Sequence, residues 1–184
     1  DLFSNPKTSL LYGKTLKNIE LGAQLTHFTF EQCSFVNFNF KGNIENLRFK
    51  HCKLKNVTFS NQASQIYFEN SRISNLTFHN KQMKYLSFVN SQLMVSNWAN
   101  KSFLYTNLKN CNCEHLNLSH ATLTFFKTHN CKFQQGNFHL AKFFDSSCFH
   151  TQFTKCNLSH MLWARCCLTK CLFENSCFDG LTFG

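Results

Sequence analysis

The stretch KSFLYTNLKNCNCEHLNLSH at residues 101–120 decides the fold, because an apolar residue recurs there at every fifth position. Phe103, Leu108, Cys113 and Leu118 are these central residues, and the pattern continues from Phe68 to Phe183. Of the 24 central positions in that range, 11 are Phe, 6 are Leu, 6 are Ile, Met, Trp or Cys, and only Thr128 is polar. A period of five fits neither the alternation of a strand nor the 3.6-residue turn of a helix.

The residue two positions before each centre is usually small or apolar, as at Ser71, Cys111 and Ala121. In an extended segment these two side chains point to the same side. The three residues that follow a centre are mostly polar, so each unit places two side chains inward and then turns a corner. Four units close a square coil of about 20 residues, and successive coils stack at the parallel-strand spacing of about 4.8 Å.

Upstream of Phe68 the pattern continues with a regular slip. The steps from Phe40 to Ile44 and from Phe59 to Ala63 are one residue short and lie 19 residues apart, and the step from Leu21 to Leu25 fits a third. One residue is therefore missing at the same corner of successive coils. Counting coils from Leu25 to residue 178 predicts about eight, in a rod about 40 Å long.

These units resemble the pentapeptide-repeat family, whose consensus is a small residue, then Asp or Asn, then Leu or Phe. The segments 106–110 (TNLKN) and 156–160 (CNLSH) match well, and the resemblance covers about residues 23–184 through 33 consecutive centres. It implies an all-β fold, a right-handed quadrilateral parallel β-helix of the solenoid type. This chain departs from the usual pattern in its Phe-rich centres, its many Cys residues and its basic balance.

The domain organisation predicted from the repeat is simple. Residues 1–22, which hold the only proline, Pro6, are expected to be a cap or the end of a preceding segment, and residues 23–184 to form one elongated domain. The chain begins with Asp1 and stops at Gly184 within a unit, so we expect a fragment of a longer polypeptide. No membrane span is predicted, because the longest early apolar run is only residues 10–12.

Eleven cysteines could indicate a disulfide scaffold, but their positions favour buried thiols. One column of inward small residues contains Cys33, Cys52, Cys111, Cys131 and Cys171, and stacked neighbours point in parallel, which suits a disulfide poorly. We therefore expect reduced thiols and a reducing compartment, the cytoplasm or the host cytosol of a secreted effector. Cys167 and Cys177 precede a centre directly, so they are predicted to face outward and to be the reactive cysteines.

Residues 20 apart lie above one another, so a functional site should appear as a column. Two asparagine columns are predicted to be structural ladders, because Asn tolerates corner geometry and its amide can bond to the next coil. A third column brings His120 and His160 to one corner with His139 between them, but two coils separate the outer pair, so no metal site is predicted. The asparagine ladders are Asn70, Asn90, Asn110 and Asn130, and Asn97, Asn117, Asn137 and Asn157.

The column that best suits a partner surface is aromatic. Tyr85, Tyr105 and Phe125, called the aromatic column below, occupy one corner in three successive coils. Outward aromatic side chains bordered by lysines are typical of protein interfaces, whereas the structural alternative is a stacked ladder that stabilises the corner. The neighbouring residues predicted to extend this partner-binding surface are Leu104, Phe144, Phe149 and Lys84, with Lys101, Lys127 and Lys142 at its border.

The charge balance argues against one function of the family. Some pentapeptide-repeat proteins are implicated in protecting DNA gyrase by imitating DNA, which needs an acidic surface. This chain has 19 Lys and Arg against 9 Asp and Glu, a formal net charge of +10, so DNA mimicry is disfavoured.

Three functional hypotheses follow. The first is a non-catalytic protein-interaction scaffold or recognition module with an unidentified protein partner, and the resemblance permits a bacterial secreted effector because such repeats occur there. The alternative is a binder of nucleic acid or another polyanion through basic faces, against which the charge is spread over three faces rather than one groove. An enzyme is not expected, because no phosphate loop, paired carboxylates or cavity is indicated. No cofactor is predicted.

Overall fold

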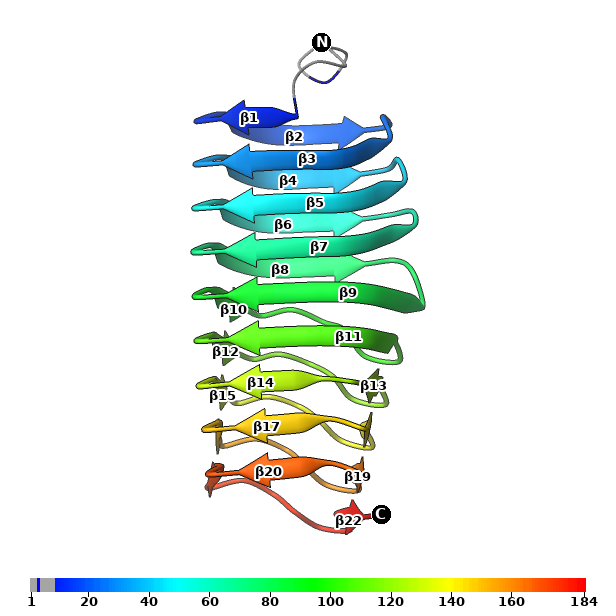
Figure 1. Cartoon of the computed structure of the whole chain (residues 1–184), viewed down its shortest axis with the longest axis vertical. Helices are drawn as coiled ribbons and strands as arrows, with labels where there is room; N and C mark the ends of the chain where they lie inside the picture. Colours follow the sequence, from blue (N-terminus) through cyan, green and yellow to red (C-terminus); the bar gives the residue numbers. More distant parts are fainter. Residues whose placement is uncertain (1–2, 4–8) are drawn as a thin grey trace.

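The computed structural model describes residue 3 and residues 9–184, and these form a parallel β-solenoid in which strands stack coil upon coil (Figure 1). The predicted all-β, right-handed quadrilateral β-helix is confirmed, with about nine turns rather than about eight. The additional turn arises because coiling begins upstream of residue 23, at Leu10, where β1 pairs with β3. Pro6 lies outside the described residues.

The strands fall into two length classes, and the upstream ones are mostly seven residues long. They are β1 (Leu10–Tyr12), β2 (Thr15–Leu21), β3 (Leu25–Glu31), β4 (Ser34–Phe40), β5 (Ile44–Lys50), β6 (Lys53–Phe59), β7 (Ala63–Glu69), β8 (Arg72–Phe78), β9 (Gln82–Val89), β10 (Gln92–Met94) and β11 (Ser102–Lys109). Each long strand continues through a corner of the coil.

The downstream strands are two or three residues long, so each lies on one face only. They are β12 (Asn112–Glu114), β13 (Thr122–Thr124), β14 (Lys127–His129), β15 (Lys132–Gln134), β16 (Lys142–Phe144), β17 (Ser147–Phe149), β18 (Gln152–Thr154), β19 (Leu162–Ala164), β20 (Cys167–Thr169), β21 (Leu172–Glu174) and β22 (Thr182–Phe183).

Two parallel sheets build the walls of the rod. One contains β1, β3 and the strands stacked below them, and the other runs from β2 to β21. In the coil that begins at β11, the first, second, third and fourth faces carry the centres Phe103, Leu108, Cys113 and Leu118. Partners lie 19 residues apart upstream, as in Leu25 with Ile44, and 20 apart downstream, as the slips predict.

The centres fill the interior. Phe30, Phe49, Phe68 and Phe88 stack along one side with ring centroids 4.8–5.3 Å apart and planes within 16° of parallel. Burying each such ring contributes roughly 1.5–3 kcal/mol. The one polar centre, Thr128, is also buried, and its hydroxyl lies 2.8 Å from that of Thr151, so the two satisfy each other.

The corners depend on one backbone conformation that recurs two residues after most centres, although not after Phe40, Phe59 or Phe78. There the described chain has 29 non-glycine residues with φ near +50 to +60°, and 11 of them are Asn. A left-handed conformation costs most L residues about 1–2 kcal/mol, and Asn tolerates it because its short side chain bonds locally. Corner chemistry therefore explains why Asn recurs in this sequence.

Candidate functional site

The aromatic column is assembled by three consecutive coils of the first sheet. Tyr85 lies in β9, Tyr105 in β11, and Phe125 directly follows β13, and these strands pair in register. The rings of Tyr85 and Tyr105 are 5.0 Å apart at 3°, and those of Tyr105 and Phe125 are 4.9 Å apart at 6°. The predicted column therefore exists as a stacked ridge on one edge of the rod.

The ridge is exposed although its members are large. Tyr85 and Tyr105 are 45% and 43% exposed, and Phe125 is half-buried. Because the rings stack face to face, the surface they offer to a partner is mostly a strip of apolar ring edges with the polar tyrosine hydroxyls beside them. An exposed apolar strip of this kind is typical of an interaction surface.

The backbone at these corners disfavours aromatic residues. Tyr85, Tyr105 and Phe125 have φ of 57°, 59° and 55°, in the left-handed region where a bulky side chain is unusual. In the coils above, the same corner carries Asn46 and Gln65 with φ of 53° and 55°. The fold thus accepts amides at this position, and the aromatic rings are not needed to form the corner.

Of the predicted neighbours, only some join the aromatic column. Leu104 and Phe144 are half-buried on the first face beside it, and Lys84 is exposed directly before Tyr85. Phe149 is separated from them on the second face, where its ring lies 5.1 Å from His129 and 4.3 Å from His150. The second face begins after the corner, so Phe149 contacts imidazoles instead of the ridge.

The lysines predicted at the border are spread over several rows. Lys101 lies before the first face, where its ammonium donates to the carbonyl of Asn80 at 3.1 Å and burial lowers its pKa. Lys142 and Lys127 precede centres of the first and second faces and are exposed. Lys84 is therefore the only one of the four adjacent in sequence to a ring of the column.

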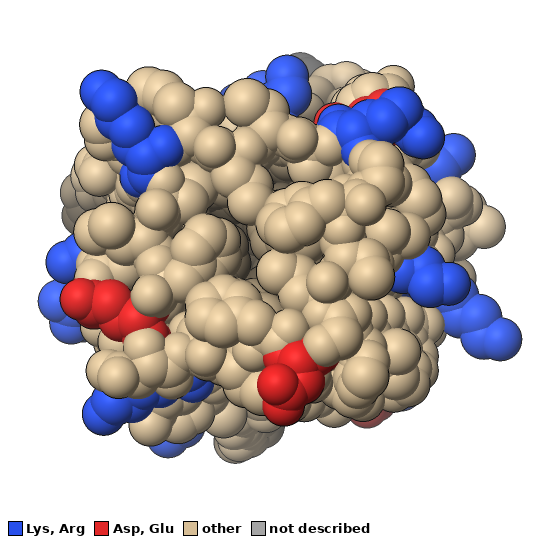
Figure 2. Space-filling view, turned by 90° about the horizontal axis from the view of Figure 1, so that it is seen from below, with Lys and Arg blue, Asp and Glu red and all other residues tan. Residues whose placement is uncertain are grey.

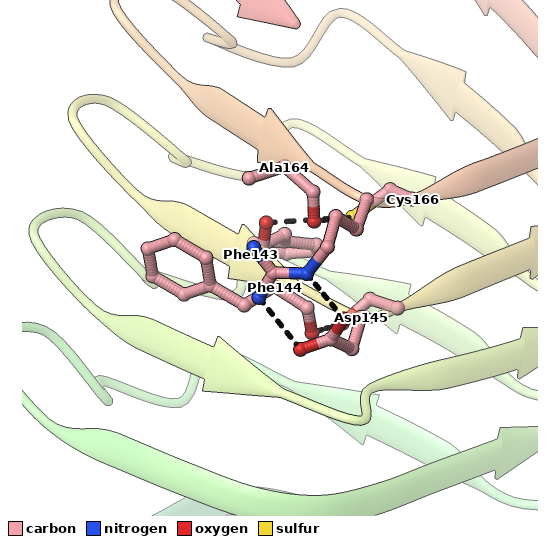
Figure 3. A network of polar contacts seen from close by, with 7 residues as sticks. Phe143, Phe144, Asp145, Ala164 and Cys166 are labelled. Carbon is pink, nitrogen blue, oxygen red and sulfur yellow. Dashed lines mark hydrogen bonds and ion pairs between the residues drawn. The ribbon is translucent and has the colours of Figure 1, made fainter. Parts of the chain in front are cut away.

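Sequence reasoning missed how the aromatic column ends. At the same corner, one and two coils below Phe125, Asp145 and Arg165 form a two-pronged ion pair (Figure 3). The Arg165 Nε and Nη2 atoms donate to Oδ1 and Oδ2 of Asp145 at 2.7 and 2.9 Å. The guanidinium holds the pKa of Asp145 below its usual range. The sequence could have predicted this ion pair, because Asp145 and Arg165 are oppositely charged residues at corner positions 20 residues apart.

Asparagine amides bond between coils in both predicted columns, although not along the whole of either column. Asn130 donates to Asn110 and Asn110 to Asn90 at 3.0 and 2.9 Å, and Asn70 occupies the same corner above them. In the other column, which comprises Asn97, Asn117, Asn137 and Asn157, Asn117 donates to Asn97 at 3.0 Å. The amide oxygen of each of these four accepts the backbone N–H two residues on, which closes the turn.

A third ladder was not predicted. Asn37, Asn56 and Asn75 each donate to the Asn one coil above, at 2.9, 2.9 and 3.0 Å, and the ladder starts at Asn18. Its members lie 19 residues apart because of the slip, so a search at a spacing of 20 passes over them.

The three histidines form an edge-to-face stack. The rings of His120 and His139 are 5.8 Å apart and those of His139 and His160 5.7 Å, and Nδ1 of His139 lies 2.7 Å from the hydroxyl of Ser159. Among the described residues, no group of three or more His, Cys, Asp or Glu side chains is arranged to hold a metal ion.

The cysteines lie as the repeat places them. Seven are buried, two are half-buried, and Cys167 and Cys177 are exposed. Thiols in the inward column donate to backbone carbonyls, as Cys52 does to Lys50 at 3.2 Å, a role that Ser71 fills with its hydroxyl. Burial raises the pKa of the Cys52 thiol to about 12. Their reduced state and the compartment remain predictions.

Comparisons with known proteins give likenesses of fold. No family model and no curated protein sequence matches the chain. It is similar to QnrB1, a plasmid-mediated fluoroquinolone resistance protein, with 17% identity and a TM-score of 0.42 over 98% of this chain and 86% of that one.

Two further solved structures are similar in shape. HetL, a pentapeptide-repeat protein involved in heterocyst differentiation regulation from Nostoc sp. strain PCC 7120, has 10% identity and a TM-score of 0.41 over 95% of this chain and 91% of that one. The A-module of the Azotobacter vinelandii mannuronan epimerase AlgE4 has 5% identity and a TM-score of 0.28 over 92% of this chain and 75% of that one. At these identities the likeness concerns the fold alone.

No helix in the described part of the chain has the length and hydrophobicity that a membrane crossing requires.

Proposed function

We propose that this protein is a non-catalytic interaction module and that a partner protein docks on the aromatic column. The observation that carries the proposal is the conflict between side chain and backbone at Tyr85, Tyr105 and Phe125. Each aromatic side chain occupies a left-handed corner that polar residues occupy elsewhere in the same column, namely His27, Asn46 and Gln65 above and Asp145 and Arg165 below. Strain at exposed positions is a reasonable sign of a functional demand.

The stacking within the column supports a protein partner over a nucleic acid. Single-stranded nucleic acids bind aromatic platforms by stacking their bases on free ring faces. The two faces of Tyr105 are already covered by Tyr85 and Phe125 at about van der Waals separation, 5.0 and 4.9 Å between centroids. Ring edges and phenol hydroxyls remain exposed, and these suit the mixed apolar and polar surface of a protein partner.

The structural alternative is that stacking alone maintains these rings. The two stacked pairs are worth about 0.5–1.5 kcal/mol each, whereas the three left-handed corners cost about 1–2 kcal/mol each. Stacking therefore does not exceed the backbone cost, so it gives no reason to prefer aromatic residues over Asn at these corners. A reducing cytoplasm, or the host cytosol of a secreted bacterial effector, is part of the proposal.

The test replaces Tyr105 and Phe125 together by Asn, the residue most often found at these corners. A matched control replaces Gln135 and Lys155 by Asn. These two residues lie at corners of the third face, with φ of 53° and 54°. Partners would be captured from lysate with each protein, identified by mass spectrometry, and their affinities then measured with purified components.

We expect the Tyr105/Phe125 variant to lose at least about 2 kcal/mol of binding while the control retains it, since aromatic anchors have this weight in interfaces. Its free energy of unfolding should stay within about 1 kcal/mol of the wild-type value. A variant that unfolds much more easily and retains every partner would show that the column is a structural ladder.

A further inference from the structure

A basic trough crosses the third face in the upstream coils. It is lined by β4, β6, β8 and β10 and encloses about 410 Å³. The backbone around the buried centres Phe35, Leu54 and Ile73 forms its floor, and outward side chains on either side of these centres form its two walls. From this trough we propose that the protein binds an extended acidic segment of a partner protein there.

Three cations converge on the trough. Lys53 and Arg72 are register partners on one wall, one coil apart, and Lys55 lies on the other wall, two residues from Lys53. Along a strand that separation is about 6.6 Å, and between coils it is about 4.8 Å. Flexible lysine and arginine side chains at these spacings can reach adjacent carboxylates on one ligand.

These cations lack acidic partners in the described chain. The ion pairs of the described lysines and arginines join Lys41 to Glu20 and Arg165 to Asp145. No Asp or Glu lines the trough, and the first acid in its rows is Glu114, one coil below Met94. Above the trough, Lys17 extends one wall as the register partner of Val36. The local charge therefore favours an anionic occupant.

The apolar lining decides which anion fits. Val36 and Met94 stand in the same wall as Lys55, and Met94 is 37% exposed. A peptide can cover them with apolar side chains while its carboxylates pair with the cations. Nucleic acids and sulfated glycans have no such side chains. The one aromatic residue in the lining, Phe35, is fully buried, so it offers no exposed ring on which a base could stack.

The geometry suits an extended strand. Four coils lie along the trough, a length of about 14 Å, which four or five extended residues span at about 3.3 Å each. Ser34, Ser74 and Gln92 line the walls and can bond to the peptide backbone. Recognition of acidic motifs by clusters of basic residues is a recurring mode of peptide binding.

The trough is independent of the aromatic column. The third face lies opposite the first face, so a substitution in one leaves the other unchanged. Failure of the column experiment would therefore not affect the trough, and failure here would leave the column proposal standing.

The experiment measures binding of a fluorescent peptide of about seven residues with alternating Glu and Val to the full chain by anisotropy, at physiological salt. The neutral control peptide carries Gln in place of Glu. The charge-reversed protein is Lys53→Glu with Arg72→Glu, matched by Lys109→Glu with Lys170→Glu on the second face. A Met94→Ser variant tests the apolar wall, and circular dichroism verifies that every variant is folded.

We expect the Lys53/Arg72 variant to bind the acidic peptide at least about tenfold more weakly and the Lys109/Lys170 variant to stay within about twofold of wild type. The Gln peptide should not bind, and Met94→Ser should weaken binding about threefold.

Three results would overturn the proposal. The first is equal weakening by both charge reversals, which would show unspecific attraction to a basic protein. The second is no peptide binding up to about 1 mM, which corresponds to negligible affinity. The third is tighter binding of oligo-dT or a heparin hexasaccharide than of the peptide with no effect of Met94→Ser, which would identify the trough as a polyanion site.

Discussion

The coils upstream of β10 and the coils downstream of it use the same five-residue unit but close the corner between the fourth and first faces differently. Downstream, five residues separate Leu118 from Leu123, and the N–H of Ala121 donates to the carbonyl of Leu118 at 3.0 Å, closing a turn within the coil. Upstream, four residues separate Phe40 from Ile44, and the N–H groups of Lys41 and Gly42 donate to Leu21 in the coil above, at 2.8 and 3.2 Å. The corner from Phe78 to Met83 also has five residues, but there the N–H of His79 still donates to Phe59 in the coil above at 2.9 Å. The bond within a coil is therefore a feature of the downstream corners, as at Ala121.

The two regions also differ in what fills them. In the upstream interior, Phe rings stack in two rows among buried Leu, Ile and Val side chains, and only Cys33 and Cys52 of the eleven cysteines lie there. The downstream interior mixes Leu, Phe, Trp163 and thiols. Figure 2 shows the rod from its C-terminal end, where charged side chains lie mostly around the rim. There Phe178 and Phe183 are 43% and 68% exposed, although both occupy predicted centres. Because of these differences, we expect the stabilities of the two regions to respond differently to core substitutions, to alkaline pH and to substitutions that strain the backbone.

The largest effect should come from the core. Phe49 is fully buried between Phe30 and Phe68, and Phe49→Ala should cost about 3–5 kcal/mol through the cavity it leaves. Phe138→Ala, downstream, should cost slightly less within the same range, because Phe138 makes edge contacts rather than stacked ones. Urea titrations of both variants would measure this, and equal or reversed costs would contradict the idea of a stacked upstream core.

Alkaline pH should lower the free energy of unfolding chiefly through buried thiols in the downstream region. Burial raises the pKa of Cys113, Cys148 and Cys156 there, whereas Cys52 is the corresponding upstream case. A raised folded-state pKa gives stability that is complete below the unfolded thiol pKa near 8.5 and is lost as pH rises toward the folded value. Each such thiol should remove about 1.4 kcal/mol per pH unit in that window.

Urea titrations under reducing conditions at pH 8 and at pH 10 would measure the loss. The Cys113→Ala/Cys148→Ala variant should show a shallower decline with pH than wild type, and Cys52→Ala a smaller change than the pair. An unchanged slope in the double variant would mean that these thiols do not control the alkaline response.

Replacing the glycine at the shortened corner should have a smaller effect on stability than replacing a core Phe. A Cβ on Gly42 would lie 2.1 Å from the carbonyl oxygen of Ala23, a backbone atom in the coil above. A Cβ on Gly136 would lie 2.7 Å from Cε2 of Phe138, a ring that can shift. Gly42→Ala should therefore cost about 1–3 kcal/mol and Gly136→Ala less. Thermal unfolding of the two variants would reveal the order, and a larger loss at Gly136 would refute the assigned corner geometry.

Much of this architecture could be predicted from residue spacing, because an inward side chain every fifth position leaves the chain few ways to coil. The slips at Ile44 and Ala63 likewise predict the position of the shortened corner. The start of the solenoid at Leu10 was missed, since β2 has the centres Leu16 and Leu21 but little of the consensus around them. The site was harder to predict. Spacing placed Phe149 on the next face, but it could not show that the side chain packs against His129 and His150 instead of extending the aromatic column.

The smallest effect should separate the two kinds of Asn ladder. Asn56 lies upstream at a corner with φ of 54° and bonds to Asn37 and Asn75, so Asn56→Ala loses both amide bonds and leaves Ala in a left-handed conformation. Asn117 lies downstream, outside that conformation, and Asn117→Ala loses its bond to Asn97 and its cap on the N–H of Ser119.

We expect about 1–2 kcal/mol for Asn56→Ala, chiefly from the backbone conformation, and about 0.5–1.5 kcal/mol for Asn117→Ala, from hydrogen bonds alone. An Asn56→Gly variant isolates the two contributions, because Gly accepts the left-handed corner and lacks the amide. If Asn56→Gly recovers most of the stability lost in Asn56→Ala, the corner conformation is the main reason for Asn in this solenoid. If Asn56→Gly recovers none of the lost stability, the amide ladder is the main reason for Asn. The upstream coils then depend on hydrogen bonds between coils both at the asparagine corners and at the shortened corner.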